Sequence, residues 1–276
     1  MSALAEVLQA LSFRHVSGEL PRLLDTARQE QLSYEAFLHQ VLLVEATHRQ
    51  QRLVGVRALA AHLPPKVTLE GFDFAFQPSL SARHIRELAS LSFIATCTSV
   101  VFLGPPGVGK THLSTALAWH ALDAGYSVRF TTLARLLDDL DAARHRGDLG
   151  ARLRAYTRPQ LLVLDEIGYT HLAAKQAQLF FQLVNARYER GACIVTSNKS
   201  FSDWGAMVGD EVLASAILDR LLHHADVISI AGQSYRMKER AAFFLPAVPA
   251  EPATRTPERR KRGRQPIAPQ DHDEVA

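Results

Sequence analysis

The chain has 276 residues, of which 47% are hydrophobic and 21% are charged, and its formal net charge is +3. This composition excludes collagen, coiled-coil rods and wholly disordered chains, and it predicts one large globular domain with a small appendage. Cys97 and Cys193 have no CxxC partner and no histidine at metal-ligand spacing, so neither a disulfide scaffold nor a zinc site is indicated. We expect a cytoplasmic protein without a membrane partner, because neither an export signal nor a membrane-spanning apolar run is visible.

The sequence pattern of residues 1–65 predicts a small all-α domain. Apolar residues at helical spacing begin the chain: Leu4, Val7, Leu8 and Leu11. Ser33 is a candidate N-cap for a further helical pattern, and the pair Pro64-Pro65 blocks its continuation. Residues 67–78, VTLEGFDFAFQP, favour an extended linker or a short strand. We therefore place a domain boundary near Lys66.

Residues 66–245 predict an α/β domain. Five short apolar runs alternate with helical stretches in this region: SVVFL, YSVRF, QLLVLD, ACIVTS and ADVISI. Buried strands that alternate with helices indicate a parallel sheet of about five strands, flanked by helices. Residues 246–276 are rich in proline and poor in large apolar side chains, which predicts a disordered basic tail.

The strongest motif is GPPGVGKT, which follows an apolar strand and opens a helical run from His112 to Leu122. In a P-loop of this kind, backbone N–H groups surround a phosphate, Lys110 reaches the outer phosphates and the Thr111 hydroxyl binds Mg²⁺. A glycine-rich turn with a chance lysine is the ordinary alternative. We expect ATP and Mg²⁺ as ligands, and the expected nucleotide contacts are Gly104, Pro105, Pro106, Gly107, Val108, Gly109, Lys110, Thr111 and His112.

Two further apolar strands end in polar residues. LLVLDE has the form of a Walker B motif, in which Asp165 would hold Mg²⁺ and Glu166 would activate the attacking water. A strand end with solvated acids is the alternative. Asn198 ends the run ACIVTSN, and adjacent parallel strands open onto the same crevice, so Asn198 could reach the water or the γ-phosphate. Asparagine is also common in turns for local reasons.

Arg220 and Arg236 are candidates for a catalytic charge. Arg220 lies late in an apparent helix from Glu211 to His223, and Arg236 follows the last strand in the sequence SYR. An arginine supplied across a subunit boundary can neutralise charge in a phosphoryl-transfer transition state. A surface salt bridge is the ordinary alternative for both.

Residues 49–66 and 144–158 are rich in arginine and are candidates for contacts with the backbone of a nucleic acid. Their basic residues are Arg49, Arg52, Arg57, Lys66, Arg144, Arg146, Arg152, Arg154 and Arg158. A charge run is often only a solvated face, and that alternative stays open.

The segments LPPKVTLEGFDF, GPPGVGKTHL, LLVLDEIGY, RYERG, TSNKSFSDWG and AILDRLLHHADVISIAGQSYR occur in this order. With them, about residues 33–240 resemble the IstB-like transposition helper ATPases of bacterial insertion sequences. These are AAA+ proteins, P-loop ATPases related to the DnaC helicase loaders and the initiator clade.

The resemblance implies an ATP-hydrolysing homo-oligomer with shared ATP sites. Such an oligomer assembles on double-stranded DNA, remodels it and stimulates a cognate transposase. By the same resemblance, Asn198 is sensor I, Arg220 is an arginine finger that acts on a neighbouring subunit's ATP, and Arg236 is sensor II. The helical insertion after the second strand and the N-terminal domain are then the DNA-facing parts.

Three other interpretations remain open. A replicative helicase loader of the DnaC type shares every catalytic motif and differs in its partner. A small-molecule kinase has the same P-loop, but it gains nothing from Asn198 or from an arginine of another subunit. In a nucleotide-gated DNA-binding scaffold, ATP would switch assembly and hydrolysis would be incidental.

Overall fold

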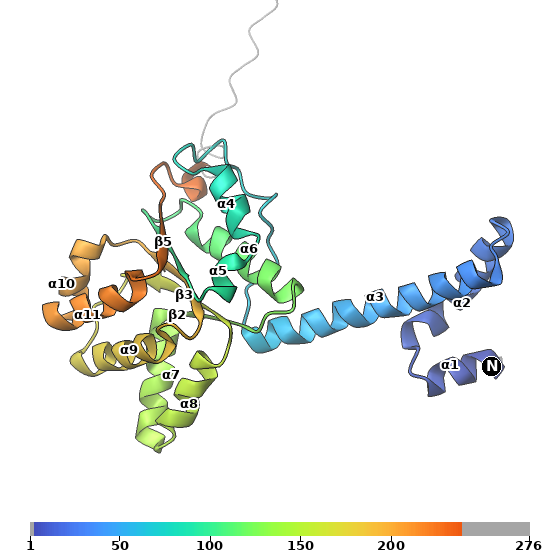
Figure 1. The fold of residues 1–276 in the computed structure, drawn as a ribbon, viewed down its shortest axis with the longest axis horizontal. Helices are drawn as coiled ribbons and strands as arrows, with labels where there is room; N and C mark the ends of the chain where they lie inside the picture. The colour runs from blue at the N-terminus through green and yellow to red at the C-terminus, as the bar shows by residue number, and fades with distance from the viewer. Residues whose placement is uncertain (1–2, 239–276) are drawn as a thin grey trace, which may run out of the picture.

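The computed structural model describes residues 3–238 and begins with a helical arm. The arm consists of α1 (Ala3–Ala10), α2 (Arg14–Gln29) and α3 (Tyr34–Ala61). Figure 1 shows α3 as a long rod that leads away from the sheet and carries α1 and α2 at its far end. Ser33 is the N-cap of α3, as predicted, because its Oγ accepts a hydrogen bond from the Ala36 N–H at 3.2 Å.

The core of the arm is small. Val16, Leu23 and Val41 are its buried residues, and Leu8 packs partly against them. The predicted helix at the start of the chain is present, but most of its apolar face is not buried. Leu4, Val7 and Leu11 are 48%, 54% and 60% exposed.

The larger domain is built on one parallel sheet with the strand order β2-β3-β4-β1-β5. Its strands are β1 (Ser99–Leu103), β2 (Val128–Thr132), β3 (Leu161–Ile167), β4 (Ala192–Ser197) and β5 (Ala225–Ser229). All five predicted strands are therefore confirmed, and so is the α/β class. Parallel pairing aligns the carboxyl ends of the strands, which brings β1, β3 and β4 to one edge.

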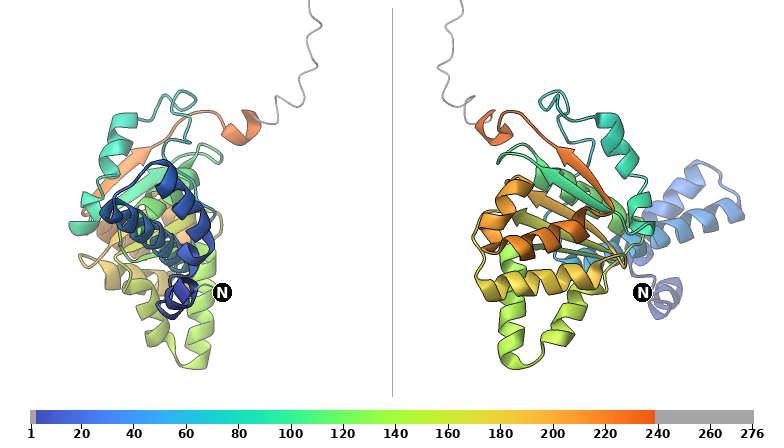
Figure 2. Two further views of the ribbon diagram at one scale, coloured as in Figure 1. Left: turned by 90° about the vertical axis from the view of Figure 1, so that its right-hand side faces the viewer. Right: turned by 60° about the vertical axis from the view of Figure 1, so that its left-hand side comes forward.

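Helices cover both faces of the sheet. One face packs against α4 (Ala82–Leu88), α5 (Ser92–Ala95) and α6 (Lys110–Asp123). The other packs against α7 (Leu133–Arg146), α8 (Leu149–Thr157), α9 (Ala174–Arg187), α10 (Trp204–Val208) and α11 (Glu211–Leu222), and a short 3₁₀ turn, η1 (Phe201–Asp203), precedes α10. Successive residues of β1 alternate between the two cores, since Val100 and Phe102 face the first and Val101 faces the second. In Figure 2, α7 and α8 project from the body as a helical hairpin.

The last turns of α3 belong to the core of the larger domain. Ala58 and Ala61 are buried in the same cluster as Val128 of β2. The Arg129 guanidinium adds a hydrogen bond to the Ala60 carbonyl at 3.1 Å. The arm is thus continuous with the sheet domain through α3, and the boundary near Lys66 stays a prediction.

Residues 62–81, which link α3 to α4, contain turns and no strand, so the short-strand alternative for residues 67–78 is wrong. The predicted disordered tail, residues 246–276, lies outside the described residues. Within residues 3–238, no helix combines the length and apolarity that crossing a membrane requires.

Candidate nucleotide-binding site

The GPPGVGKT loop connects the end of β1 to the start of α6. Its backbone requires glycine at Gly104, Gly107 and Gly109. Gly107 and Gly109 have φ values of 84° and 99°, which side chains other than glycine rarely adopt. A Cβ at Gly109 would lie 2.4 Å from the Phe72 ring, and one at Gly107 would lie 2.0 Å from Ser234 Oγ. The loop is therefore both left-handed and tightly enclosed.

Lys110 is buried at the first turn of α6, where its ammonium folds back over the loop. Its Nζ donates hydrogen bonds to the carbonyls of Gly104 at 2.7 Å and Pro105 at 2.8 Å. Burial lowers the pKa of Lys110, the nearby Asp165 opposes this shift, and Arg236 adds to it. Lys110 and Arg236 thus bring two basic side chains to the same cavity, as an anion-binding site requires.

Thr111, Asp165 and Thr196 form a hydroxyl–carboxylate network between α6, β3 and β4. The Thr111 hydroxyl lies 3.1 Å from both carboxylate oxygens of Asp165, and the buried Thr196 hydroxyl donates a short hydrogen bond to the same carboxylate. The Glu166 N–H donates to Thr196 Oγ1 at 3.0 Å. Hydroxyl and carboxylate oxygens are the ligand types that Mg²⁺ prefers, so these residues fit that ion.

Glu166 occupies the left-handed region of backbone conformation, with φ at 63°. A non-glycine residue there is uncommon, and such strain concentrates at functional sites. Glu166 is exposed, and it lines the cavity that the P-loop opens onto, whereas Asp165 is buried behind it.

A cavity of about 310 Å³ lies over the P-loop. Its lining includes six of the nine predicted nucleotide contacts, Gly107 to His112, together with Glu166 and Arg236. Gly104, Pro105 and Pro106 do not line it. Seven lining residues were not predicted from the sequence: Gly71, Phe72, Asp73, Gln77, Tyr169, Thr196 and Tyr235.

Two segments far apart in sequence make one wall of this cavity. Tyr235 N–H donates to the Gly107 carbonyl at 2.9 Å, and Gln77 Nε2 donates to the Gln233 carbonyl at 2.9 Å. Asp73 pairs with Lys238 at 3.1 Å, and that lysine together with the Phe76 N–H lowers the pKa of Asp73. Asp73 belongs to the motif LEGFDF and Tyr235 to the motif SYR, but only the fold reveals that the two motifs share a wall.

Asn198 and Arg220 do not line this cavity. Asn198 follows β4, with its Oδ1 buried and without a hydrogen-bond partner among the described residues. Arg220 lies on α11, where its Nε donates to Asn185 Oδ1 at 2.9 Å and its guanidinium lies 4.9 Å from the Phe181 ring centre. Within one chain, the structure thus brings Arg236 to the P-loop but keeps Arg220 away from it.

The family model of the IstB-like ATP binding protein matches residues 6–242. The chain belongs to this family. An ATP-binding protein of the insertion sequence IS21 from Pseudomonas aeruginosa is 46% identical over 87% of the chain and 91% of its own length. A counterpart from the insertion sequence IS5376 of Geobacillus stearothermophilus is 42% identical over 78% of the chain and 85% of its own length.

Solved structures show that this IstB-like chain has the AAA+ fold. The replication initiator DnaA, bound to AMPPCP and single-stranded DNA, superposes with a TM-score of 0.53 at 22% identity, over 68% of this chain and 58% of that one. DnaI superposes with a TM-score of 0.51 at 20% identity, over 60% of this chain and 92% of its own.

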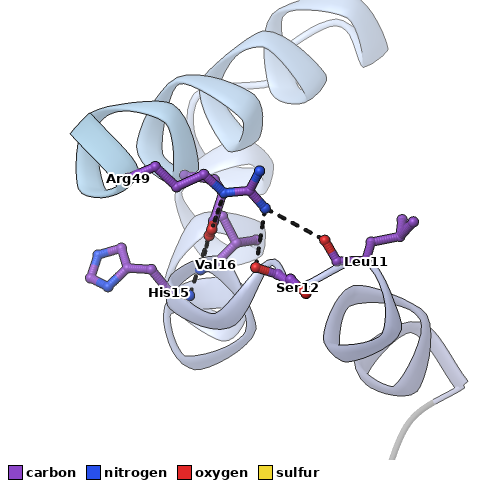
Figure 3. A network of polar contacts seen from close by, with 6 residues as sticks. Leu11, Ser12, His15, Val16 and Arg49 are labelled. Atoms are coloured by element: carbon purple, nitrogen blue, oxygen red, sulfur yellow. Dashed lines mark hydrogen bonds and ion pairs between the residues drawn. The ribbon is translucent and has the colours of Figure 1, made fainter. Parts of the chain in front are cut away.

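Several predicted DNA contacts of the IstB-like chain are engaged within the chain itself. Figure 3 shows Arg49 bound to the carbonyls of Leu11 and Ser12, at 3.5 and 3.1 Å, and its Nε also donates to Glu45 at 3.0 Å. Acids also pair with several of the others: Lys66 with Asp123, Arg144 with Asp141, Arg146 with Asp148 and Arg152 with Asp139. Arg52, Arg57, Arg154 and Arg158 are exposed. DNA binding by all these residues stays a prediction.

A second basic cavity, also of about 310 Å³, lies where α3 meets the sheet domain. Its charged lining residues are Arg129, Arg135, Arg152 and Asp139, and His62 also faces it. Burial and the three arginines lower the pKa of His62. Arg129 and Arg135 lie outside the two arginine-rich runs, so the sequence pattern did not indicate them.

Proposed function

We propose that this chain is an ATP-dependent DNA-binding helper of a bacterial transposase. It would oligomerise on target DNA, remodel it, and stimulate transposition through ATP binding and hydrolysis. The observation that carries the proposal is the joint placement of Lys110, Thr111 and Glu166 around one cavity, with Asp165 hydrogen-bonded to Thr111 behind its wall. Binding alone would not require an exposed glutamate beside the Mg²⁺ ligands.

Each of these groups has a distinct role in the proposed hydrolysis. The Lys110 ammonium would exchange its two carbonyl acceptors for the oxygens of the outer phosphates. Thr111 and Asp165 would hold Mg²⁺, which neutralises charge on the phosphates when bound. Glu166 would orient the attacking water and accept its proton, because its carboxylate lines the cavity. Arg236 would contact the nucleotide of its own chain, as sensor II does.

We further propose that Arg220 acts on the ATP of a neighbouring subunit. The distance of Arg220 from the P-loop cavity of its own chain supports this role, since an arginine finger supplied in trans need not line its own site. Asn198 would serve as sensor I, and its unpaired amide oxygen is available for that role. Both assignments depend on an assembly with shared active sites.

The relatives are named for insertion sequences, which supports a transposase as the partner. A helicase loader of the DnaC type remains the alternative, because the catalytic residues would be the same. Stimulation of a cognate transposase by this chain would favour the helper, whereas stimulation of replicative helicase loading would favour the loader. The cytoplasmic location stays a prediction.

The first experiment measures steady-state ATP hydrolysis against protein concentration, with and without duplex DNA. We expect turnover that rises more than linearly with protein and increases with DNA. Arg220→Ala should lower it by about 10³-fold or more while ATP binding persists. Asn185→Ala is the matched control, because it removes the same contact between α9 and α11 but keeps the guanidinium.

Turnover that rises linearly with protein, and that neither DNA nor Arg220→Ala changes, would contradict the proposal. It would favour a small-molecule kinase. Glu166→Gln tests whether the chain is a nucleotide-gated DNA-binding scaffold, in which hydrolysis is incidental. A helper that requires hydrolysis would stall in the ATP-bound assembly, whereas a scaffold would retain its full effect on transposition.

A further inference from the structure

The motif RYERG and the two histidines that follow Arg220 and α11 have no role in the proposed function, and they meet at the end of the sheet where the strands begin. RYERG forms the turn between α9 and β4, and DRLLHH ends α11 ahead of β5. The His224 carbonyl accepts a hydrogen bond from Ser99 N–H at the start of β1. The nucleotide cavity lies at the opposite end of the same strands, so the two places are distinct.

Glu189, His223 and His224 form a cluster of metal-ligating side chains at this meeting point. One ligand atom from each lies within 4.8 Å of the other two, and among residues 3–238 no other group of three does so. The His223 and His224 rings have centroids 4.1 Å apart, and His224 Nε2 lies 3.9 Å from Glu189 Oε1. All three residues are exposed, so an ion could enter from solvent.

Tyr188 forms a hydrogen bond with one histidine of this cluster. Its Oη lies 2.8 Å from His223 Nδ1. In the tautomer with a proton on Nδ1, His223 donates to Tyr188 and keeps Nε2 available as a ligand, the arrangement that usually orients metal-bound histidine.

The backbone of the turn is strained at Glu189, where φ is 57°. A left-handed conformation is costly for a residue with a long side chain. The following Gly191 is closely packed against the Arg187 guanidinium, so the turn is held in place by buried contacts. Because the turn is fixed, Glu189 keeps this conformation, and its carboxylate lies 3.9 Å from His224 Nε2.

We propose that Glu189, His223 and His224 bind a divalent transition-metal ion, Zn²⁺ being the best fit, with water as the fourth ligand. Zinc takes imidazole nitrogen and carboxylate oxygen at about 2.0–2.2 Å, which places tetrahedral ligands about 3.4 Å apart. The present separations therefore need to contract by at most about 1.5 Å, within reach of exposed side-chain rotation. An ion here would tie the end of α11 to the turn before β4, one helical turn beyond Arg220.

Zinc titration of the metal-free, full-length protein tests the site directly. Without nucleotide or Mg²⁺, we expect one Zn²⁺ per chain at micromolar free zinc. His223→Ala and His224→Ala should each weaken binding by at least about tenfold, and Glu189→Gln should weaken it as well. His145→Ala is the matched control, because His145 is exposed and lies 3.6 Å from Asp141 but has no second histidine beside it.

A wild-type protein without a saturable 1:1 site, or variants that bind Zn²⁺ like the wild type, would overturn the proposal. Substitution with Co²⁺ gives a readout that does not depend on folding of the variants. The wild type should give the intense visible spectrum of tetrahedral Co²⁺, and only a weak octahedral spectrum would reject the site. Both measurements are independent of ATP hydrolysis, so failure of the proposed function would not affect them.

Discussion

The Thr196 hydroxyl accepts a hydrogen bond from the backbone N–H of Glu166 at 3.0 Å. The same oxygen donates to the Asp165 carboxylate, so one side chain of β4 holds both acids of β3. Thr196 is itself buried and does not supply a charge. It is a positioning residue for the proposed Mg²⁺ ligand and the proposed base.

Thr196→Val should lower kcat for ATP hydrolysis by about 10–100-fold, since a hydrogen bond to a charged group contributes about 1.5–3 kcal/mol. Valine has a similar shape but leaves the Glu166 N–H unpaired and the Asp165 carboxylate less constrained. The Mg²⁺ concentration for half-maximal activity should rise as well. Thr196→Ser keeps the hydroxyl and should retain most of the activity; an equal loss in both variants would assign Thr196 to packing alone.

Glu45 fastens the N-terminal arm. It is 4% exposed, and its carboxylate accepts hydrogen bonds from the N–H groups of His15 and Val16 at the start of α2 and from Arg49. Burial by itself would raise the pKa of Glu45, but these donors outweigh it and lower the pKa. Glu45→Gln should destabilise the arm by about 1–3 kcal/mol at neutral pH.

The sign of the pH dependence follows from the lowered pKa. The stabilisation by Glu45 is present above the carboxyl pKa of the unfolded chain and is lost as pH falls through the lower pKa of the folded chain. Hydrogen exchange of amides in α1 and α2 should therefore differ between wild type and Glu45→Gln at pH 7 and converge in acid. An equal difference at both extremes of pH would contradict this role.

His62 should titrate below its usual pKa of 6.5, because burial and then Arg129, Arg152 and Arg135 disfavour its protonated form. Its contribution to stability is fully present above pH 6.5 and is lost as pH falls toward the folded-state pKa. NMR titration of the imidazole should show a higher pKa in Arg135→Ala than in wild type. The distant Arg28→Ala, on α2, should leave the His62 titration unchanged.

Arg187 is a buried cation without a carboxylate partner among the described residues. Its guanidinium donates to the carbonyls of Tyr156 at 2.9 Å, Pro159 at 2.9 Å and Ala192 at 2.7 Å. Arg187→Lys keeps the charge but loses the fork that reaches all three, so unfolding free energy should fall by about 3 kcal/mol or more. Denaturant unfolding measures this loss, and Arg190→Lys, an exposed neighbour, should have little effect.

The strands, the P-loop and the Walker B pair were predictable because each is encoded in a short, contiguous run of residues. An apolar run ending at Leu103, followed by glycines and Lys110, carries its structural meaning locally. The N-cap at Ser33 has the same local character, and the structure confirms it.

The wall of the cavity and the pairing of the arginines were not predictable, because they depend on contacts between segments that are distant in sequence. Phe72 and Tyr235 line the same cavity although 163 residues separate them in sequence. The arginine runs suggested a free basic surface, but Arg152 on α8 pairs with Asp139, which lies on α7 and outside that run. The short first helix shows a third limit, because periodicity predicted the helix but not that its apolar side would remain exposed.

The 28 residues of α3 form one uninterrupted helix of about 42 Å, anchored in the sheet domain only by its last turns. If α3 tilts about its anchored end, the pivot of that motion lies beside Arg129 and the basic cavity. A tilt of about 10° at the pivot would carry the far end, with α1 and α2, through about 7 Å. Small rearrangements around the bond from Arg129 to Ala60 are therefore amplified into large displacements of the arm.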